Sequence, residues 1–368
     1  MRSFACRNCG QQIFFENSRC LNCDAPLGFE WEPRELLALE HDGGLLRPLP
    51  GQAFESPRRR CANAELAACN WLVAAEGELC LACSLTRTRP ADQDALGLAE
   101  LKVAEAAKRW LLFELGELGL PLEPADGATG LAFDLLSSAV EPVTTGHADG
   151  VITLDLAESD DAHRVAMREQ MAEPYRTVLG HLRHEIGHYY FPILVADDSA
   201  RERARELFGD ERADYPEALD RHYAQGPPPG WQADHVSAYA TMHPSEDWAE
   251  TFAHYLHIRD TLQTAASHGV RIDGPQETLE PLSAVPEADP PPDFQSLIDE
   301  WLPLTYALNA INRSMGRSDL YPFVLTPPVI AKLGFVDELV RGAGSASRRT
   351  PTTSPGLIAR RRPRARPR

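Results

Sequence analysis

Two histidines one helical turn apart constrain this chain more than any other feature. His184 and His188 are four residues apart, and Glu185 follows the first of them. On a helix, positions i and i+4 share one face, so both imidazoles can point a nitrogen at one metal ion. Glu185 then lies beside the open coordination position, where it can take a proton from water. The spacing therefore predicts a zinc site carried by a helix.

The residues around the motif indicate a helix with one buried face. Apolar and aromatic residues recur at helical spacing, at Tyr175, Val178, Leu179, Leu182 and Ile186. We predict that this helix runs from about Pro174 to Tyr190 and that Pro192 helps to end it, because proline lacks a hydrogen-bond donor. The alternative is a chance match on a solvated helix, and the amphipathic pattern favours the metal site.

A third protein ligand is required, because a catalytic zinc site combines three such ligands with one open position. Pro244-Ser245 predicts the start of a helix, with Ser245 at or near its N-cap, and Glu246 and Glu250 then share one face. We assign Glu246 to the metal and Glu250 to a hydrogen bond that orients a histidine ligand. One alternative is that Glu250 binds the metal and Glu246 orients the histidine. The other is that both carboxylates are exposed to solvent and bind no metal.

The eight cysteines divide into two sets of four, each of which predicts a zinc site closed by protein ligands. The first set consists of two C-x-x-C pairs: Cys6, Cys9, Cys20 and Cys23. The second is less regular: Cys61, Cys69, Cys80 and Cys83. Free thiols are the alternative for the first set, and a three-ligand site or structural thiols for the second. Closed sites of this kind stabilise folding and do not catalyse.

The composition and the N-terminal sequence limit the cellular location and the kinds of partner that we expect for this protein. The N-terminus lacks the apolar segment of a secretory signal, and no run approaches 18 apolar residues, so we expect a cytoplasmic protein without a membrane span. The formal charge is −18, although residues 342–368 hold eight arginines and no acid. The rest of the chain is acidic, which argues against broad binding of nucleic-acid phosphates. The exceptions are the Arg-rich tail and the cysteine-rich N-terminal region, which we describe below as a zinc ribbon.

Composition and pattern divide the chain into three parts. Residues 1–90 form a zinc-ribbon module, 91–341 a metal-binding domain, and 342–368 a disordered Arg-rich tail. Residues 84–94 read as a linker, and a long helix follows from about Asp94 to Gly119. Residues 131–135 and 151–156 predict strands. The second is our candidate for a sheet edge beside the metal helix, where an extended peptide could add, although an ordinary half-buried strand fits its pattern equally well.

The glutamate helix resembles that of the gluzincin class of zinc peptidases, through the E-x-x-A-E pattern from Glu246 to Glu250. Tyr239, seven residues before Glu246, matches a tyrosine that assists catalysis in the lethal-factor-like branch. The resemblance implies that its phenol donates a hydrogen bond to the oxyanion of the tetrahedral intermediate. A tyrosine that only packs is the alternative.

Most of the chain also resembles bacterial zinc-binding metallopeptidases with an N-terminal zinc ribbon. The matching segments are the four-cysteine start, 146–150, 173–176, 180–188, 312–316 and 319–323. The resemblance implies an α+β fold, in which a small zinc-ribbon module precedes a zincin-like, mainly helical domain with a small sheet.

These features predict a zinc metallopeptidase that acts on a protein or peptide, with Glu185 as general base and Tyr239 and Glu250 assisting. We expect about three zinc ions per chain, one catalytic and two structural. The alternative is an interaction protein that binds protein or nucleic acid through the ribbon and uses the peptidase-like region as a scaffold. Glu185 argues against it, since a scaffold needs no general base.

Overall fold

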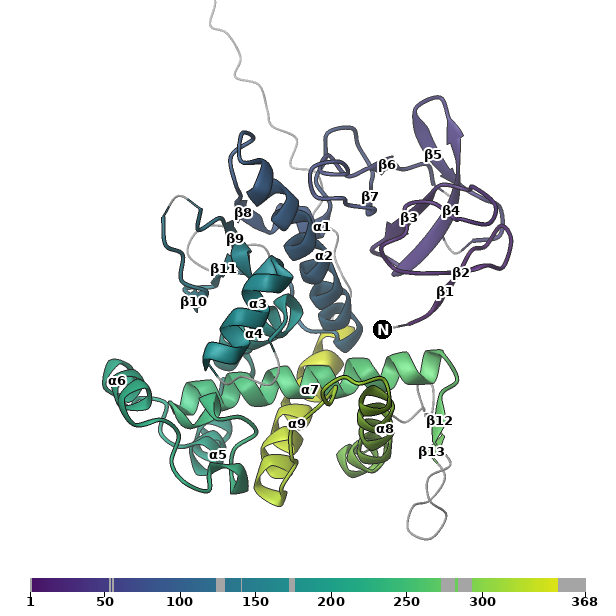
Figure 1. The fold of residues 1–368 in the computed structure, drawn as a ribbon. Helices are drawn as coiled ribbons and strands as arrows, with labels where there is room; N and C mark the ends of the chain where they lie inside the picture. Colours follow the sequence, from purple (N-terminus) through teal and green to yellow (C-terminus); the bar gives the residue numbers. More distant parts are fainter. Residues whose placement is uncertain are drawn as a thin grey trace, which may run out of the picture.

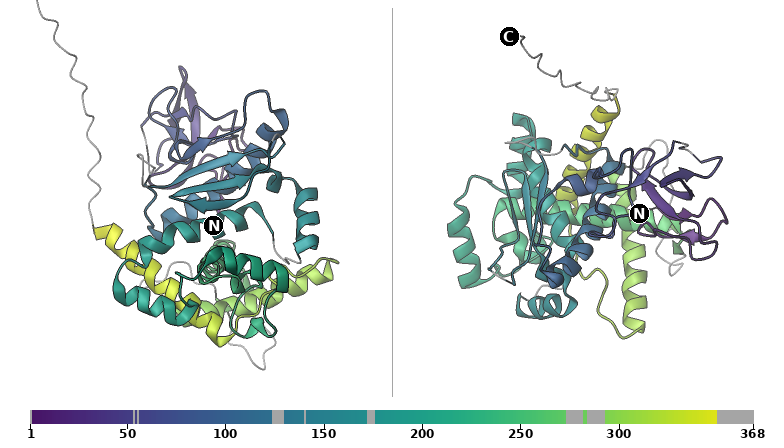
Figure 2. Two further views of the ribbon diagram at one scale, coloured as in Figure 1. Left: turned by 90° about the vertical axis from the view of Figure 1, so that its left-hand side faces the viewer. Right: turned by 90° about the horizontal axis from the view of Figure 1, so that it is seen from above.

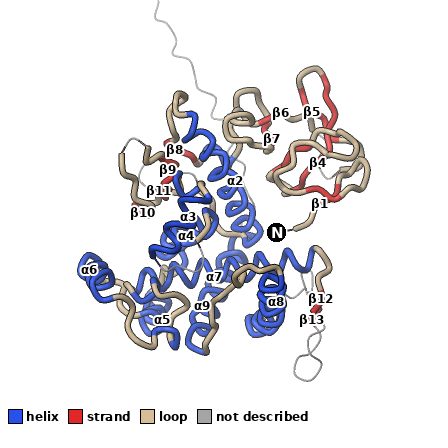
Figure 3. The backbone as a smooth tube through the Cα atoms, viewed as in Figure 1, coloured by secondary structure: helices blue, strands red, loops and turns tan. Residues whose placement is uncertain are grey.

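The computed structural model describes residues 2–349, apart from residues 53, 55, 124–129, 140, 172–175, 273–281 and 284–292. Small sheets occupy the N-terminal quarter, a mixed sheet follows, and helices build the rest (Figure 1). In the tube view, most strands lie in the upper half around the long helix α2 (Ala95–Leu118), whereas β12 (Arg271–Ile272) and β13 (Leu282–Ser283) lie among the helices of the lower half (Figure 3). The α+β fold predicted from the sequence is confirmed.

The N-terminal region consists of short antiparallel pairs joined by turns. The first two strands form a hairpin, the next three a small sheet, and the last two another pair. Their bounds are β1 (Phe4–Ala5), β2 (Gln12–Ile13), β3 (Leu27–Glu30), β4 (Glu35–Asp42), β5 (Leu45–Pro48), β6 (Arg59–Arg60) and β7 (Leu72–Val73). A single helical turn, α1 (Leu81–Ser84), contains the last cysteine of the second set.

The long helix α2 (Ala95–Leu118) has the ends that the sequence predicts. The Asp94 side chain accepts a hydrogen bond from the Gly97 backbone N–H at 2.8 Å, which satisfies an otherwise unpaired donor at the N-terminus. At the other end, Gly119 adopts a left-handed conformation with φ 72°, which glycine tolerates without a steric penalty.

A four-stranded sheet lies beside α2, in the order β10-β11-β9-β8. Its strands are β8 (Thr86–Thr88), β9 (Ala132–Leu136), β10 (Gly146–Ala148) and β11 (Val151–Asp155). Strand β11 pairs with β9 on one side and β10 on the other, so the predicted edge strand is wrong, and β10 is the edge. The predicted linker at 84–94 is also corrected, because its β8 pairs with β9 and Arg87 binds Asp134 at 2.9 Å.

Helices form the remainder of the molecule. They are α3 (Asp161–Met171), α4 (Val178–Leu194), α5 (Asp198–Phe208), α6 (Tyr215–Gln225), α7 (Pro244–Ser267), α8 (Phe294–Ser314) and α9 (Pro327–Arg349). Short 3-10 turns, η1 (Leu156–Ser159), η2 (Trp231–Ala233) and η3 (Tyr239–Thr241), and the pair β12 (Arg271–Ile272) and β13 (Leu282–Ser283) connect them. Helix α4 lies between the sheet and α7, and it contacts both.

The predicted end of the histidine helix and the predicted start of the disordered tail need correction. Helix α4 continues past Pro192 to Leu194, because the proline lies in the last turn and the buried Leu194 and Val195 favour continuation. Its predicted start at Pro174, and Tyr175 of the predicted apolar stripe, lie outside the described residues. Helix α9 extends to Arg349, so the first residues of the predicted disordered tail are helical. Residues 350–368 lie outside the described residues.

An aromatic core joins the N-terminal region to the rest of the chain. The ring of Phe15 lies 5.2 Å from that of Phe113 in α2, 4.9 Å from Phe29 and 6.3 Å from Trp71. All four side chains are almost fully buried. In Figure 2, the N-terminal region and the mixed sheet lie on one side of the molecule, with α7 to α9 on the other. Within the described parts of the chain, no helix is long and apolar enough to cross a membrane.

Candidate metal centre

Helix α4 presents the two histidines from a face next to its buried stripe. The Thr177 side chain caps the helix by accepting a hydrogen bond from the Gly180 N–H at 2.9 Å. Val178, Leu182 and Ile186 are buried, as their spacing predicts. His184 and His188 are half-buried on the adjoining face, which points toward α7.

Helix α7 presents the two glutamates from its first turns. Pro244 occupies the first turn, as predicted, the N-cap itself is His243, and Ser245 lies near it, two residues later. The ring Nδ1 of His243 accepts a hydrogen bond from the Ser245 N–H at 3.1 Å, so an imidazole takes the capping role usually filled by a short polar side chain. Glu246 is 2 % exposed in this turn, and Glu250 follows one turn later.

The two helices cross closely at a glycine of the histidine motif. A Cβ atom on Gly187 would lie 3.0 Å from Ala249 Cα and 3.2 Å from Phe252 Cβ, so only glycine fits without a shift. Nearby, the Trp248 indole N–H donates to the Gly187 carbonyl at 2.8 Å. This contact brings the histidines of α4 close to the glutamates of α7.

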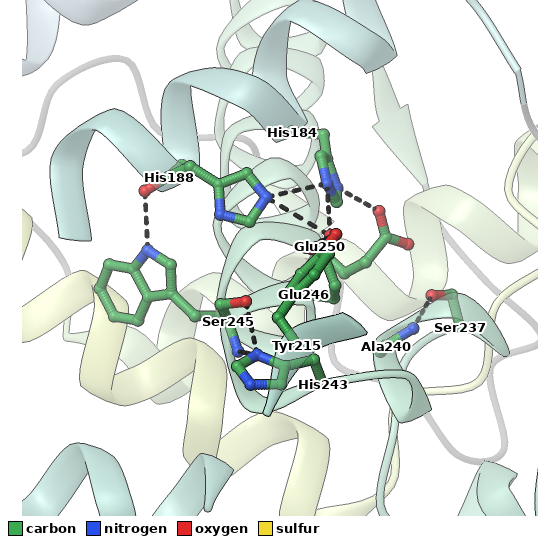
Figure 4. A network of polar contacts seen from close by, with 11 residues as sticks. His184, His188, Tyr215, Ser237, Ala240, His243, Ser245, Glu246 and Glu250 are labelled. Atoms are coloured by element: carbon green, nitrogen blue, oxygen red, sulfur yellow. Dashed lines mark hydrogen bonds and ion pairs between the residues drawn. The ribbon is translucent and has the colours of Figure 1, made fainter. Parts of the chain in front are cut away.

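The side chains of the two helices converge on one point (Figure 4). His184 Nε2 lies 2.9 Å from Glu246 Oε2 and 3.3 Å from His188 Nε2, and the third edge, from His188 Nε2 to Glu246 Oε2, is 3.4 Å. A tetrahedral zinc ion with bonds of about 2.0 Å has ligands about 3.3 Å apart. Two imidazole nitrogens and one carboxylate oxygen therefore fit zinc in chemistry and in spacing.

Glu250 lies on the opposite side of the His184 ring. Its Oε1 accepts a hydrogen bond from His184 Nδ1 at 2.7 Å, which leaves Nε2 directed at the other two candidate ligands. Burial on its own raises the pKa of Glu250, but the hydrogen bond from His184 outweighs burial and lowers the pKa to about 2. This carboxylate is therefore ionised at neutral pH.

The two remaining predicted catalytic residues lie close to this point. Glu185 is 8 % exposed, and burial raises its pKa against the opposing attraction of His184 and His188. The ring of Tyr239, in η3, lies 5.9 Å from that of His184. Burial, followed by the negative charge of Glu246, raises the pKa of Tyr239, so its phenol retains a proton and can donate a hydrogen bond.

Two residues in this centre escape sequence reasoning. Tyr215, the first residue of α6, donates from its phenol to Glu246 Oε1 at 3.0 Å. His243 caps α7 and also donates from Nε2 to the Ala213 carbonyl at 3.1 Å. Neither lies at a motif spacing from the histidines, so only the folded arrangement of α6 and α7 reveals them.

Both cysteine sets converge as their spacing predicts. Within each set, the four sulfur atoms lie within 4.8 Å of one another. In the first set, Cys6 and Cys23 Sγ are 3.7 Å apart, as are those of Cys9 and Cys20; in the second, Cys69 and Cys80 Sγ are 3.6 Å apart. Zinc with four thiolates at about 2.3 Å has sulfur atoms about 3.8 Å apart, so both sets fit zinc.

The sets differ in their access to solvent. Cys9 is exposed and Cys23 half-buried, whereas all four members of the second set are buried. The Cys61 sulfur accepts hydrogen bonds from the backbone N–H groups of Asn63 and Cys80 at 3.5 and 3.4 Å. Such bonds favour the thiolate, the form of cysteine that binds zinc.

A histidine pair on one helix facing a glutamate helix, behind a module with two four-cysteine clusters, defines a zinc-binding protein of the metallopeptidase class. The chain belongs to the family described as "Putative zinc-binding metallo-peptidase", whose profile matches residues 98–339. Residues 3–94 match a zinc-ribbon domain. The family relationship predicted from the sequence is thereby confirmed.

Similar proteins occur in mycobacteria. Uncharacterized proteins of Mycobacterium tuberculosis and Mycobacterium bovis are each 54 % identical to this chain over 347 residues, which is 92 % of this chain and 95 % of theirs. No solved structure matches the chain. Membership of a peptidase family indicates a peptide substrate.

Proposed function

We propose that this protein is a zinc-dependent peptidase that hydrolyses amide bonds with Glu185 as the general base. The observation that carries the proposal is the convergence of His184, His188 and Glu246 around one point, with Glu185 on the same helix as the histidines. Zinc held there would polarise a substrate carbonyl and lower the pKa of water to about 7. The donor set is that of a catalytic site, since three protein ligands leave one position open.

The protein's own groups then divide the proton transfers and the charge stabilisation. Glu185 accepts a proton from the attacking water and later delivers it to the leaving amine. Tyr239, a protonated phenol beside His184, donates a hydrogen bond to the negative charge that develops on the carbonyl oxygen. Glu250 keeps the His184 ring in the orientation that directs Nε2 at the metal.

The assignment of Glu246 as the third ligand, in preference to Glu250, is supported by their positions around His184. Glu246 Oε2 approaches both histidines at Nε2, whereas Glu250 approaches only Nδ1 of His184, on the far side of the ring. Glu246 thus faces the convergence point, whereas Glu250 bonds the His184 ring on the opposite side.

The two cysteine clusters are proposed to hold structural zinc, which gives about three zinc ions per chain. Four thiolates close the coordination sphere, so neither cluster offers an open position for a substrate. Each cluster instead stabilises a region of short strands whose core is too small to fold easily alone.

The test compares the wild-type protein, Glu185→Gln and Glu202→Gln on a peptide library, with cleavage read by mass spectrometry. Glu202 is exposed on α5 and serves as the matched control. We expect Glu185→Gln to retain zinc and fold but to lose at least 100-fold in rate, the lower end of what general-base catalysis contributes. Equal cleavage by Glu185→Gln, or no cleavage by any zinc-loaded form, would reject the proposal and favour an interaction role for the ribbon.

A further inference from the structure

The two oxygens of the Glu246 carboxylate have different partners. Oε2 lies 2.9 Å from His184 Nε2 and 3.4 Å from His188 Nε2. Oε1 points away from the histidines and accepts a hydrogen bond from the Tyr215 phenol at 3.0 Å. Figure 4 shows Tyr215 on the side of Glu246 opposite the imidazoles. The carboxylate therefore presents one oxygen to the convergence point and one to a neutral donor.

The element that carries Tyr215 is tied to the start of the glutamate helix. Asp214 caps α6 by accepting from the Glu217 N–H at 2.9 Å, which sets Tyr215 in the first helical position. His243 caps α7, donates to the Ala213 carbonyl just before α6, and lies with its ring 5.2 Å from that of Tyr215. One histidine thus joins the N-termini of α6 and α7, and so holds the phenol at its distance from Glu246.

We propose that Tyr215 is a positioning residue that restrains Glu246 to binding the metal through Oε2 alone. This inference rests on the proposed function, because it assumes that Glu246 is a zinc ligand. A carboxylate is able to bind a metal through one or both oxygens, and a hydrogen bond to an ionised oxygen is stronger than one between neutral groups. With one lone pair of Oε1 engaged by the phenol, binding of the metal through both oxygens would compete with that hydrogen bond and weaken it.

The experiment compares Tyr215→Phe with wild type and with Tyr223→Phe. Tyr223 lies on the same helix and is 66 % exposed, so its variant controls for the loss of a phenol that does not contact Glu246. Zinc affinity is measured by competition with a chelator, and the centre is isolated by subtracting the same measurement on each protein with His184→Ala. We expect Tyr215→Phe to weaken binding by 10- to 100-fold, as is typical when a partner of a metal ligand is lost, and Tyr223→Phe to leave it unchanged.

A spectroscopic measurement separates positioning from a general loss of structure. Cobalt(II) is substituted for zinc, and its visible ligand-field spectrum in the histidine site is taken as the same His184→Ala difference. A change from one to two carboxylate oxygens alters this spectrum, so we expect a shift in Tyr215→Phe while circular dichroism stays as in wild type. An affinity and a cobalt spectrum equal to those of wild type overturn the inference.

The outcome is independent of whether the protein proves to be a peptidase. If the wild-type protein binds zinc at His184 without cleaving any peptide, the proposed function fails while the effect of Tyr215 on affinity and spectrum still stands. If cleavage occurs and Tyr215→Phe matches wild type in both measurements, the proposed function stands and the positioning role is rejected.

Discussion

Glu250 accepts a hydrogen bond from Nδ1 of His184 at 2.7 Å, across the ring from the nitrogen that faces Glu246. We therefore expect Glu250→Ala to weaken zinc binding at this centre by about 10- to 100-fold, because the ring loses the partner that fixes its orientation. Glu250→Gln keeps an oxygen that accepts this bond and should lose less. Chelator competition measures both variants, and an unchanged affinity in Glu250→Ala would contradict the orienting role.

The glycine at the crossing of α4 and α7 makes a prediction about stability. In an open helix, glycine to alanine stabilises by about 0.5–1 kcal/mol. At Gly187 the new Cβ would lie 3.0 Å from Ala249 Cα, and overpacking of this kind costs about 1–3 kcal/mol. We expect Gly187→Ala to lower the free energy of unfolding in urea and also to weaken zinc binding, since it separates the two helices.

Gly342, in α9, provides the control for that substitution. No heavy atom lies within 4 Å of the position its Cβ would take, so Gly342→Ala should be stabilising or neutral. If Gly187→Ala proves as well tolerated as Gly342→Ala, the close contact between α4 and α7 does not determine the geometry of the centre.

The three groups of candidate metal ligands were predictable from the sequence because most of their members lie at short spacings. The His184–His188 interval and the cysteine pairs are local, and a single helical turn or knuckle brings their ligand atoms together. The two ends of α2, at the N-cap Asp94 and the C-cap Gly119, are likewise recognised from a few neighbouring residues. Such signals depend on a few neighbouring residues and can be recognised without knowledge of the tertiary fold.

The features that sequence reasoning missed depend on distant partners. Tyr215 reaches Glu246 only because the first residue of α6 lies beside the start of α7 in the folded chain, and a histidine N-cap such as His243 has no recognised sequence pattern. The interior position of β11 arises because β10 adds to it, and a pattern of alternating residues does not distinguish an edge strand from its neighbour. Helix α4 passes Pro192 because burial of the residues beyond it outweighs the local propensity to stop.

A buried ion pair between α9 and α7 predicts that removal of one partner lowers the free energy of unfolding strongly. Lys332 Nζ in α9 donates to Asp247 Oδ2 in α7 at 2.6 Å, and the two side chains are 7 % and 1 % exposed. Lys332→Met leaves the carboxylate buried without its partner, which typically costs about 3–5 kcal/mol. Adding Asp247→Asn removes the unpaired charge and should recover part of this loss. Urea unfolding of both variants tests the pair, and equal losses in the two would contradict it.

Lowering the pH should reduce the stability of the folded protein, because Glu158 becomes protonated. Burial raises the pKa of this carboxyl, but the nearby His181 ring, 3.3 Å away, and the hydrogen bonds from Arg176 outweigh burial and lower the pKa to about 2, from an ordinary value of 4.5. A lowered pKa in the folded state contributes stability that is present above pH 4.5 and is lost as the pH falls toward 2. The difference in melting temperature between wild type and Glu158→Gln should therefore shrink across this window. A difference that stays constant from pH 5 to pH 2 would reject this coupling.

Chelation should empty the two cysteine clusters at different rates. A chelator, or an alkylating reagent that follows it, has to reach the metal or a sulfur atom, and Cys9 is exposed in the first cluster whereas the second cluster is buried throughout. We expect the first cluster to lose zinc sooner and its thiols to become alkylated sooner, as read by mass spectrometry of the labelled peptides over time. Because Phe15, which lies between Cys9 and Cys20 in the sequence, packs on Phe113 of α2, loss of the first zinc should also loosen this aromatic core. Simultaneous labelling of Cys9 and Cys69 would instead mean that both clusters open in one cooperative unfolding step of the module.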